Sequence, residues 1–280
     1  MRTGISANIQ PAWEEYRYER LRECGFDCYD YNMANTKALP YTLADADFDA
    51  YLKKEKALAD AAGVRIWQVH GPWEGAHTDA TPEGREERME KMTRSIRGAS
   101  ILGAGYWVIH PIMPYGIADL DNGHAADTRR MNVEFMSELL KVAKKYGVVI
   151  CLENMPFPRF SVATPTDVLN IVREINDPDF MICLDTGHAN IFENHSPATT
   201  LRRMGEYIKV LHVHDNRGKS DEHLMPMYGS IDWQDFKCAL AECGFGGVLS
   251  LELTPKAALP PDIRDEMYKV LGMIAKYLAE

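Results

Sequence analysis

Metal-ligating side chains stand at the ends of six successive apolar runs in this sequence of 280 residues. The side chains at these ends are His70, His110, Glu153, Asp185, His212, His214 and Glu252. Three more candidates follow in the connections, namely His188, Asp221 and His223. Carboxylates brought together without a cation repel one another, whereas carboxylates and imidazoles that converge on one point make a divalent-metal site. The pattern therefore predicts a metal centre, provided that the fold gathers these ends.

The stretch ICLDTGHAN (182–190) shows the alternative for any one of these residues. Asp185 could cap a helix that begins after a tight turn, with His188 as a structural residue. A single His or Glu at a strand end is more often a hydrogen-bonded structural residue than a ligand. Six of the nine histidines nevertheless fall at these ends and in the loops that follow them. The metal interpretation depends on this concentration and not on any one residue.

Apolar or β-branched runs alternate with amphipathic segments along the chain. The predicted strands are residues 3–8, 26–32, 65–70, 106–111, 148–154, 180–186, 208–216 and 247–253. Helical spacing and cap signals predict helices over residues 130–147, 164–175, 232–244 and 262–279. Eight strand-then-helix units are typical of an α/β protein with a single (β/α)8 TIM barrel, expected as one domain over residues 1–280. A doubly wound sheet is the alternative, but no glycine-rich phosphate loop follows the first run.

Side chains of a strand alternate between its two faces, so each polar end residue shares a face with the residue two positions before it. The residues placed below polar ends in this way are Val108, Cys151, Cys183 and Ser250. The residues on the opposite face are Leu152, Leu184 and Leu251. We expect the first set to fill the barrel interior and the leucines to pack under the helices. The active site of a TIM barrel lies at the carboxyl ends of its strands, so the polar ends should share one mouth.

Composition limits the classes of function. Apolar residues make up 46% of the chain, but no run approaches the ~18 consecutive apolar residues of a membrane helix, so we expect no membrane partner. The net charge of 31 − 41 = −10 argues against nucleic-acid binding, which depends on Lys and Arg at phosphates. The beginning of the sequence has no signal-peptide features, and the six cysteines form no C-x-x-C pair. These features favour a reducing cytoplasm.

Several of the polar segments resemble one superfamily. The segments CLENMP, CLDTGHAN, VLHVHDNRG, DEHLMPMYGSIDW and LSLEL are similar to motifs of the xylose-isomerase-like TIM-barrel superfamily, over roughly residues 60–255. That superfamily holds sugar epimerases and isomerases, inosose dehydratases, hydroxypyruvate isomerases and AP endonucleases with three zinc ions. The chain departs from the superfamily segment P-G-x-G-x-I-D-W at Met227, which stands in place of the first Gly.

The resemblance implies roles for particular residues. The ligands of the single Mn²⁺ or similar ion of the ketose epimerases correspond to Glu153, Asp185, His212 and Glu252. The resemblance implies substrate contacts for His188 and Arg217. We also expect His214 and Trp107 to contact the substrate, Trp107 because an aromatic wall suits the apolar faces of a sugar. The endonucleases imply additional metal ligands at His70, His110, His188, Asp221 and His223. The number of bound ions is therefore left open at one, two or three. The expected metals are Mn²⁺, Zn²⁺ and Co²⁺.

The resemblance also implies a reaction, that of a metal-dependent isomerase or epimerase of a sugar or sugar phosphate. The metal would stabilise the enediolate left when a carbon-bound proton departs, and Glu153 and Glu252 would remove and return that proton. A lyase or dehydratase on a related polyhydroxy carbonyl substrate is the first alternative. An AP-endonuclease-like phosphoester hydrolase and a non-catalytic binder are the others. The resemblance further implies a homo-oligomer, and the sequence does not name the sugar.

Overall fold

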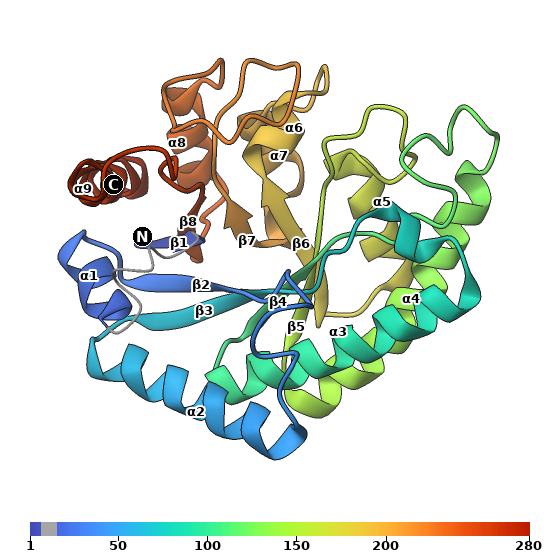
Figure 1. The fold of residues 1–280 in the computed structure, drawn as a ribbon. Helices are drawn as coiled ribbons and strands as arrows, with labels where there is room; N and C mark the ends of the chain where they lie inside the picture. The colour runs from blue at the N-terminus through green and yellow to red at the C-terminus, as the bar shows by residue number, and fades with distance from the viewer. Residues whose placement is uncertain (7–15) are drawn as a thin grey trace.

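A parallel β-barrel forms the centre of the molecule (Figure 1). The computed structural model describes residues 1–6 and 16–280. Within them eight parallel strands follow the order β7-β6-β5-β4-β3-β2-β1-β8. The strands are β1 (Arg2–Ser6), β2 (Cys28–Asn32), β3 (Arg65–His70), β4 (Tyr106–Ile109), β5 (Val149–Glu153), β6 (Phe180–Asp185), β7 (Ile208–His212) and β8 (Val248–Glu252). The TIM-barrel prediction is confirmed, except that residues 7 and 8 of the first predicted strand lie outside the described residues.

The ring closes between its last two strands at the level of the polar ends. β1 pairs with β8 along its whole length, ending at Ser6 opposite Glu252. β7 meets β8 just beyond its own end, through a parallel bridge between Val213 and Leu251. There the Glu252 N–H donates to the Val213 carbonyl at 3.0 Å. This closure brings the end of β8 beside the end of β7, and so places Glu252 near His212.

Helices connect the strands and cover the barrel (Figure 1). The α-helices are α1 (Arg17–Glu23), α2 (Asp45–Ala61), α3 (Pro82–Leu102), α4 (Ala125–Tyr146), α5 (Pro165–Ile175), α6 (Thr186–Asn190), α7 (Pro197–Met204), α8 (Trp233–Glu242) and α9 (Pro261–Ala279). Short 3₁₀ segments are η2 (Ala76–Asp79) and η3 (Gly205–Tyr207). No helix of the described residues is long and apolar enough to cross a membrane.

The predicted helices begin and end at recognisable signals. α5 begins with a capping box, because the Thr164 hydroxyl accepts from the Asp167 N–H and the Asp167 carboxylate accepts from the Thr164 N–H. Asp232 directly precedes α8 and caps it, because its carboxylate accepts from the Asp235 N–H. Such a cap contributes about 1 kcal/mol. α4 ends at Gly147, which has a φ of +67°, but begins five residues before the predicted start at 130, at Ala125.

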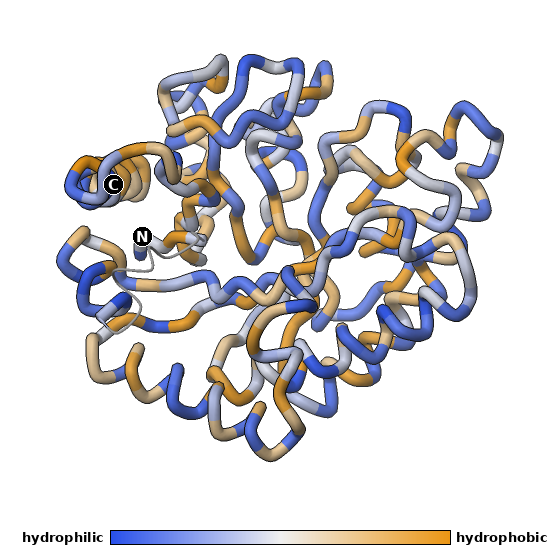
Figure 2. Tube along the Cα trace, in the orientation of Figure 1, coloured by the Kyte–Doolittle hydropathy of each residue, from blue (hydrophilic) through white to orange (hydrophobic). Residues whose placement is uncertain are grey.

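Two apolar layers follow the alternation of the strands. The cluster inside the barrel comprises Val108, Cys151, Cys183 and Val210. Leu152, Leu184 and Leu251 belong instead to the larger cluster that also contains helix residues such as Met92. Figure 2 shows hydrophobic segments gathered along the central strands, with hydrophilic stretches along the outer helices. The predicted division between the barrel interior and the layer under the helices is confirmed for these residues.

Trp107 corrects one expectation. It precedes the inward-facing Val108 on β4, so its side chain points outward. The indole N–H donates to the Ser95 hydroxyl of α3 at 2.9 Å, and the side chain is fully buried under that helix. The prediction that Trp107 contacts a substrate is therefore wrong, because the alternation that directs His110 to the mouth directs Trp107 away from it.

Candidate metal centre

Four predicted ligands converge at the carboxyl ends of the strands. Glu153, Asp185, His212 and Glu252 are the last residues of β5, β6, β7 and β8, and each offers a ligand atom within 4.8 Å of the others. We call these residues the four-ligand group. The His212 Nδ1 lies 2.9 Å from the Glu153 Oε1 and 3.3 Å from the Glu252 Oε2. Three carboxylates and one imidazole form a donor set that suits a divalent cation.

The electrostatics of this group are those of crowded, desolvated charges. Burial raises the pKa of Glu153, but attraction by His212 and the contact with His110 hold it well below its ordinary range. Burial raises the pKa of Glu252, and repulsion by Glu153 and Asp185 adds to that effect although His212 opposes it. A divalent cation between these carboxylates would remove the repulsion.

Two further histidines face the other oxygen of Glu153. The Nε2 atoms of His70 and His110 lie 3.7 and 3.2 Å from the Glu153 Oε2. The His70 Nδ1 donates to the Gly71 carbonyl at 2.8 Å, which turns Nε2 toward the carboxylate. Burial lowers the pKa of His110 to about 4, which leaves that imidazole neutral. The predicted further ligands His70 and His110 therefore lie where they can extend the four-ligand group.

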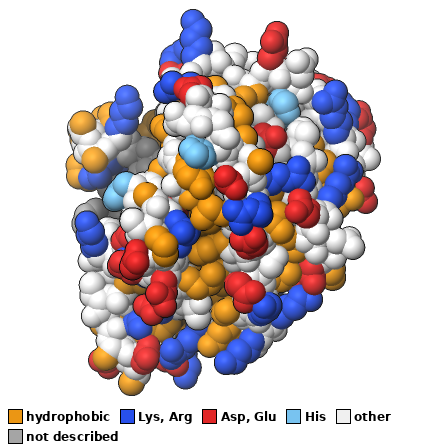
Figure 3. Space-filling model, turned by 90° about the vertical axis from the view of Figure 1, so that its right-hand side faces the viewer, with side chains coloured by type: hydrophobic (Ala, Val, Ile, Leu, Met, Phe, Trp, Pro, Cys, Tyr) orange, Lys and Arg blue, Asp and Glu red, His pale blue; other side chains and the backbone are white. Residues whose placement is uncertain are grey.

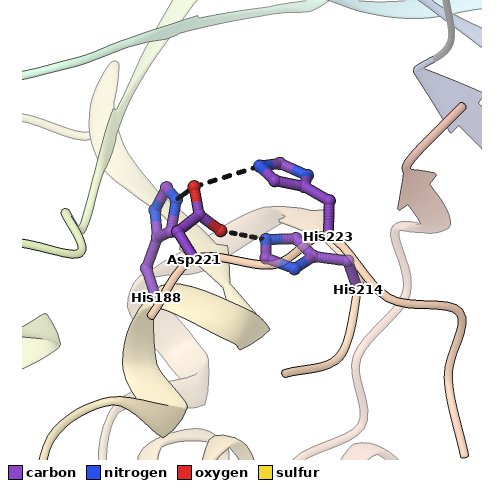
Figure 4. A group of neighbouring side chains, drawn as sticks. All are labelled: His188, His214, Asp221 and His223. Carbon is purple, nitrogen blue, oxygen red and sulfur yellow. Dashed lines mark hydrogen bonds and ion pairs between the residues drawn. The ribbon is translucent and has the colours of Figure 1, made fainter. Parts of the chain in front are cut away.

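A second group of side chains surrounds Asp221 (Figure 4). We call His188, His214, Asp221 and His223 the loop-borne cluster, because His188 lies in the short α6 and the others follow β7 in the connection to α8. The Asp221 Oδ2 lies 3.4 Å from the His188 Nε2 and 3.1 Å from the His223 Nε2. The Asp221 Oδ1 lies 3.7 Å from the His214 Nε2. His188 faces this carboxylate from one side, and the rings of His214 and His223, stacked with centroids 4.0 Å apart, face it from the other (Figure 4).

Backbone carbonyls orient two of these imidazoles. The Nδ1 of His188 donates to the Asn154 carbonyl, and the Nδ1 of His223 donates to the Glu252 carbonyl, both at 2.8 Å. Their Nε2 atoms therefore face Asp221. Burial would lower the pKa of His188, but Asp185 and Asp221 raise it to about 10. Burial likewise opposes protonation of His223, yet Asp221 and Glu252 raise its pKa to about 9.

Asp185 connects the two groups. Its Oδ2 lies 3.0 Å from the His214 Nε2, and its Oδ1 accepts from the His188 N–H at 2.6 Å. The latter contact caps α6. Asp185 therefore caps the turn and also belongs to the four-ligand group, and its role as a metal ligand stays a prediction.

The comparisons with known proteins agree with this geometry. The model of the xylose isomerase-like TIM barrel family matches residues 18–270. The chain belongs to this family. It is 34% identical over 260 residues to the uncharacterized protein MJ1311 of Methanocaldococcus jannaschii, covering 90% of this chain and 83% of that protein. It is 27% identical over 263 residues to the D-psicose 3-epimerase of Ruminiclostridium cellulolyticum, with the same two coverages of 90% and 83%.

Solved structures show the same architecture. A D-tagatose 3-epimerase-like protein is 28% identical, with a TM-score of 0.75 and complete coverage of both chains, 100% and 100%. The IOLI protein, solved with a bound zinc atom, is 21% identical, with a TM-score of 0.73 and coverage of 100% of this chain and 96% of that one. The latter similarity shows the fold alone.

In this member of the xylose isomerase-like family, a buried aspartate that the sequence analysis missed organises the loop after β7. The Asp215 Oδ2 accepts from the backbone N–H groups of Met227 and Gly229 at 3.1 and 2.9 Å, and from the Trp233 indole N–H at 2.8 Å. Met227 has a φ of +77°, a conformation that favours glycine. The loop therefore has at Met227 the backbone conformation that a glycine adopts easily.

Arg217 lies apart from the two groups. Its guanidinium pairs with Glu222, its N–H donates to the same carboxylate at 2.8 Å, and its side chain is 64% exposed. The predicted substrate contact of Arg217 stays a prediction. The sequence analysis also missed Asp30 and Gln68, which reach toward His212 from β2 and β3. The available signal was Asp30, a carboxylate in the middle of the predicted strand FDCYDYN.

Proposed function

We propose that this chain is a divalent-metal-dependent epimerase or isomerase of a small sugar-like carbonyl compound. The observation that carries the proposal is the convergence of Glu153, Asp185, His212 and Glu252, with one ligand atom of each within 4.8 Å of the others. Similarity to a D-psicose 3-epimerase over 90% of the chain supports the substrate class. The IOLI protein, which has the same fold, binds a zinc atom in its crystal structure, and this supports a divalent metal here.

The donor set fits Mn²⁺, Zn²⁺ or Co²⁺. The four-ligand group would hold the cation, which as a Lewis acid would polarise the carbonyl group of a bound sugar. Three of the four side chains are almost fully buried, and Glu252 has an 18% exposed side chain. Because Glu252 is the most accessible of the four, it is the member best placed to reach a substrate that enters from the mouth.

Two glutamates from different sides of the ring can move a proton. Glu153 ends β5 and Glu252 ends β8, so the two carboxylates approach a bound substrate from strands three positions apart. One carboxylate removes a carbon-bound proton and the other returns a proton. Return to the opposite face of the same carbon gives an epimer, and return to the neighbouring carbon gives an isomer.

The loop-borne cluster has two proposed uses. His188 and His214 lie beside Asp185, where their imidazoles can bind substrate hydroxyl groups. The three imidazoles around Asp221 could equally hold a further zinc ion. His70 and His110, which face Glu153, form another candidate set of ligands. The number of bound metal ions distinguishes these uses.

The test is solvent exchange with a glutamate variant. In D2O, the wild-type enzyme should place deuterium on a carbon of its ketose, with D-psicose and D-tagatose as the first substrates to try. Glu252→Gln should lower turnover by at least roughly 100-fold, while substrate affinity changes little, because the amide cannot transfer the proton. A matched control is Glu242→Gln at the surface. An active Glu252→Gln enzyme would contradict the proposed mechanism.

The alternatives give different products. A lyase would create a new carbonyl or enone absorbance, and a phosphoester hydrolase would cut a duplex that contains an abasic site. Basic side chains on the face drawn in Figure 3 lie among acidic ones, and the net charge is −10. Neither observation favours a duplex substrate. The expected homo-oligomer and cytoplasmic location stay predictions.

A further inference from the structure

A buried carboxylate inside the barrel contacts the histidine of the four-ligand group from behind. Asp30 lies on β2, and its Oδ2 is 2.9 Å from the His212 Nε2. Both side chains are 0% exposed. In this contact the His212 Nε2–H donates to the carboxylate oxygen.

The two nitrogens of His212 therefore face different partners. Nδ1 faces Glu153 and Glu252, at 2.9 and 3.3 Å, on the side where a cation would be held. Nε2 faces Asp30 on the opposite side of the ring. The nitrogen that ligates a metal must present a lone pair, and the hydrogen bond made by the other nitrogen decides which one does so.

Neighbouring side chains hold both members of this contact. The Gln68 Nε2 donates to the same Asp30 Oδ2 at 2.9 Å, and Gln68 is the register partner of Asp30 on β3. The His70 ring stacks on the His212 ring with an interplanar angle of 7° and a centroid distance of 5.6 Å. The imidazole plane and the carboxylate are thus both fixed before any ligand binds.

We propose that Asp30 is a positioning residue for the metal centre. Asp30 holds the Nε2 proton of His212 and thereby presents the His212 Nδ1 to the cation. The negative charge of Asp30 also makes the imidazole a better donor to a metal. This inference rests on the proposed metal centre, but it concerns a residue that would touch neither the metal nor the substrate. A residue that only filled the barrel would affect folding and leave the metal affinity of the folded protein unchanged.

The first test measures metal binding without turnover. Asp30→Ala, Asp30→Asn and the control Ser250→Ala are prepared free of metal, and Co²⁺ affinity is measured by competition with a chelating dye. Ser250 is also buried inside the strand ring, with no hydrogen-bond partner for its hydroxyl among the residues that the structure describes. We expect Asp30→Ala to weaken Co²⁺ binding by about 10- to 100-fold and Asp30→Asn to weaken it less, with Ser250→Ala unchanged. Thermal unfolding of each metal-free variant reports its folding.

The second test observes the proton itself. In the Co²⁺ protein, the Nε2 proton of His212 should give a paramagnetically shifted NMR signal that exchanges slowly with D2O. Asp30→Ala should speed up this exchange or remove the signal. If Asp30→Ala does not fold, Asp30→Leu carries both measurements, since its side chain is similar in size and cannot accept the hydrogen bond.

Three outcomes overturn the proposal. Wild-type Co²⁺ affinity and exchange in the folded Asp30 variants would refute the role of Asp30 and leave the metal centre intact. An equal loss of affinity in Ser250→Ala would show a general effect of substitution inside the barrel. A wild-type protein that takes up no Co²⁺ would refute the metal centre itself and the role of Asp30 with it.

Discussion

The four-ligand group and the loop-borne cluster use similar residue types but are held in different ways. The first stands on strand ends, which the hydrogen bonds of the barrel fix in register. The second depends on a loop, and its members Asp221 and His223 have side chains that are 29% and 40% exposed. The strand ends thus hold the four-ligand group in the buried barrel, whereas two members of the loop-borne cluster are partly exposed to solvent.

The two groups also differ in what organises them. The loop after β7 is held by Asp215, a single buried carboxylate that accepts hydrogen bonds from several backbone N–H groups. The four-ligand group is instead positioned by the ends of neighbouring strands, and Asp30 contacts the imidazole of His212 within it. We therefore expect substitutions in the loop to change the geometry of the loop-borne cluster and to leave the metal affinity of the four-ligand group largely unchanged. Substitution of Asp185, which contacts members of both groups, should affect both.

The largest expected effect is that of Asp185→Asn. The substitution removes the negative charge of Asp185 from the four-ligand group. It also alters the contacts of Asp185 with His214 and His188. We expect Co²⁺ affinity to fall by at least roughly 100-fold and turnover to become undetectable. Competition with a chelating dye measures the affinity, and Asp179→Asn at the surface is the control. Retained affinity would show that the four-ligand group does not hold the cation.

Asp215→Ala should separate the two regions. Its backbone and indole donors would be left without their acceptor, which should lower the free energy of unfolding by about 3 kcal/mol. Hydrogen exchange should accelerate in residues 216–231, while Co²⁺ affinity at the four-ligand group should change less than about 10-fold. Unchanged exchange in this loop would contradict the role assigned to Asp215.

The pH dependence of the metal-free protein should report the loop-borne cluster. His188 and His223 have pKa values raised to about 10 and about 9, so the folded state binds their protons more tightly than the unfolded state. Their contribution is complete below the unfolded pKa of about 6.5 and is lost as the pH rises through the folded values. Urea unfolding should show that the free energy of unfolding falls between pH 7 and pH 10. We expect His188 to contribute on the order of 2 kcal/mol to this fall. His188→Gln should reduce this slope and His195→Gln should not; equal slopes would contradict the assignment.

The smallest expected effect is that of Met227→Gly. Met227 has a φ of +77°, which costs an L side chain about 1 kcal/mol that glycine avoids. The Met227 side chain is 49% exposed, so few contacts are lost. Urea unfolding should show a gain of about 0.5–1 kcal/mol. A loss of stability would mean that the Met227 side chain packs in a way that outweighs its backbone strain.

The sequence predicts the barrel and the convergence of polar side chains at the strand ends because both follow from local patterns. The polar ends of the runs and the alternation of faces are visible within six or seven residues, as Cys151, Leu152 and Glu153 show. The same alternation should have excluded Trp107, since Val108 next to it was already assigned to the interior. An aromatic side chain can line a sugar site only where it faces the mouth, and the position of Trp107 on the strand excludes this.

The supporting residues could not be predicted in this way. Asp30 contacts His212 across 182 positions of sequence, and only the closed ring brings β2 to face β7. The donors to Asp215 are spaced irregularly in a loop, at Met227, Gly229 and Trp233. Neither set follows a helical or strand period, so their roles become visible only when the barrel is assembled.

The most direct test of the metal centre is the metal content of the wild-type protein, purified without added metal or chelator and measured by elemental analysis. We expect about one Mn, Co or Zn per chain, held by the four-ligand group. Two or three ions per chain would add the loop-borne cluster or His70 and His110 as ligand sets. A protein that contains no divalent metal, and takes up none on titration, would contradict the account.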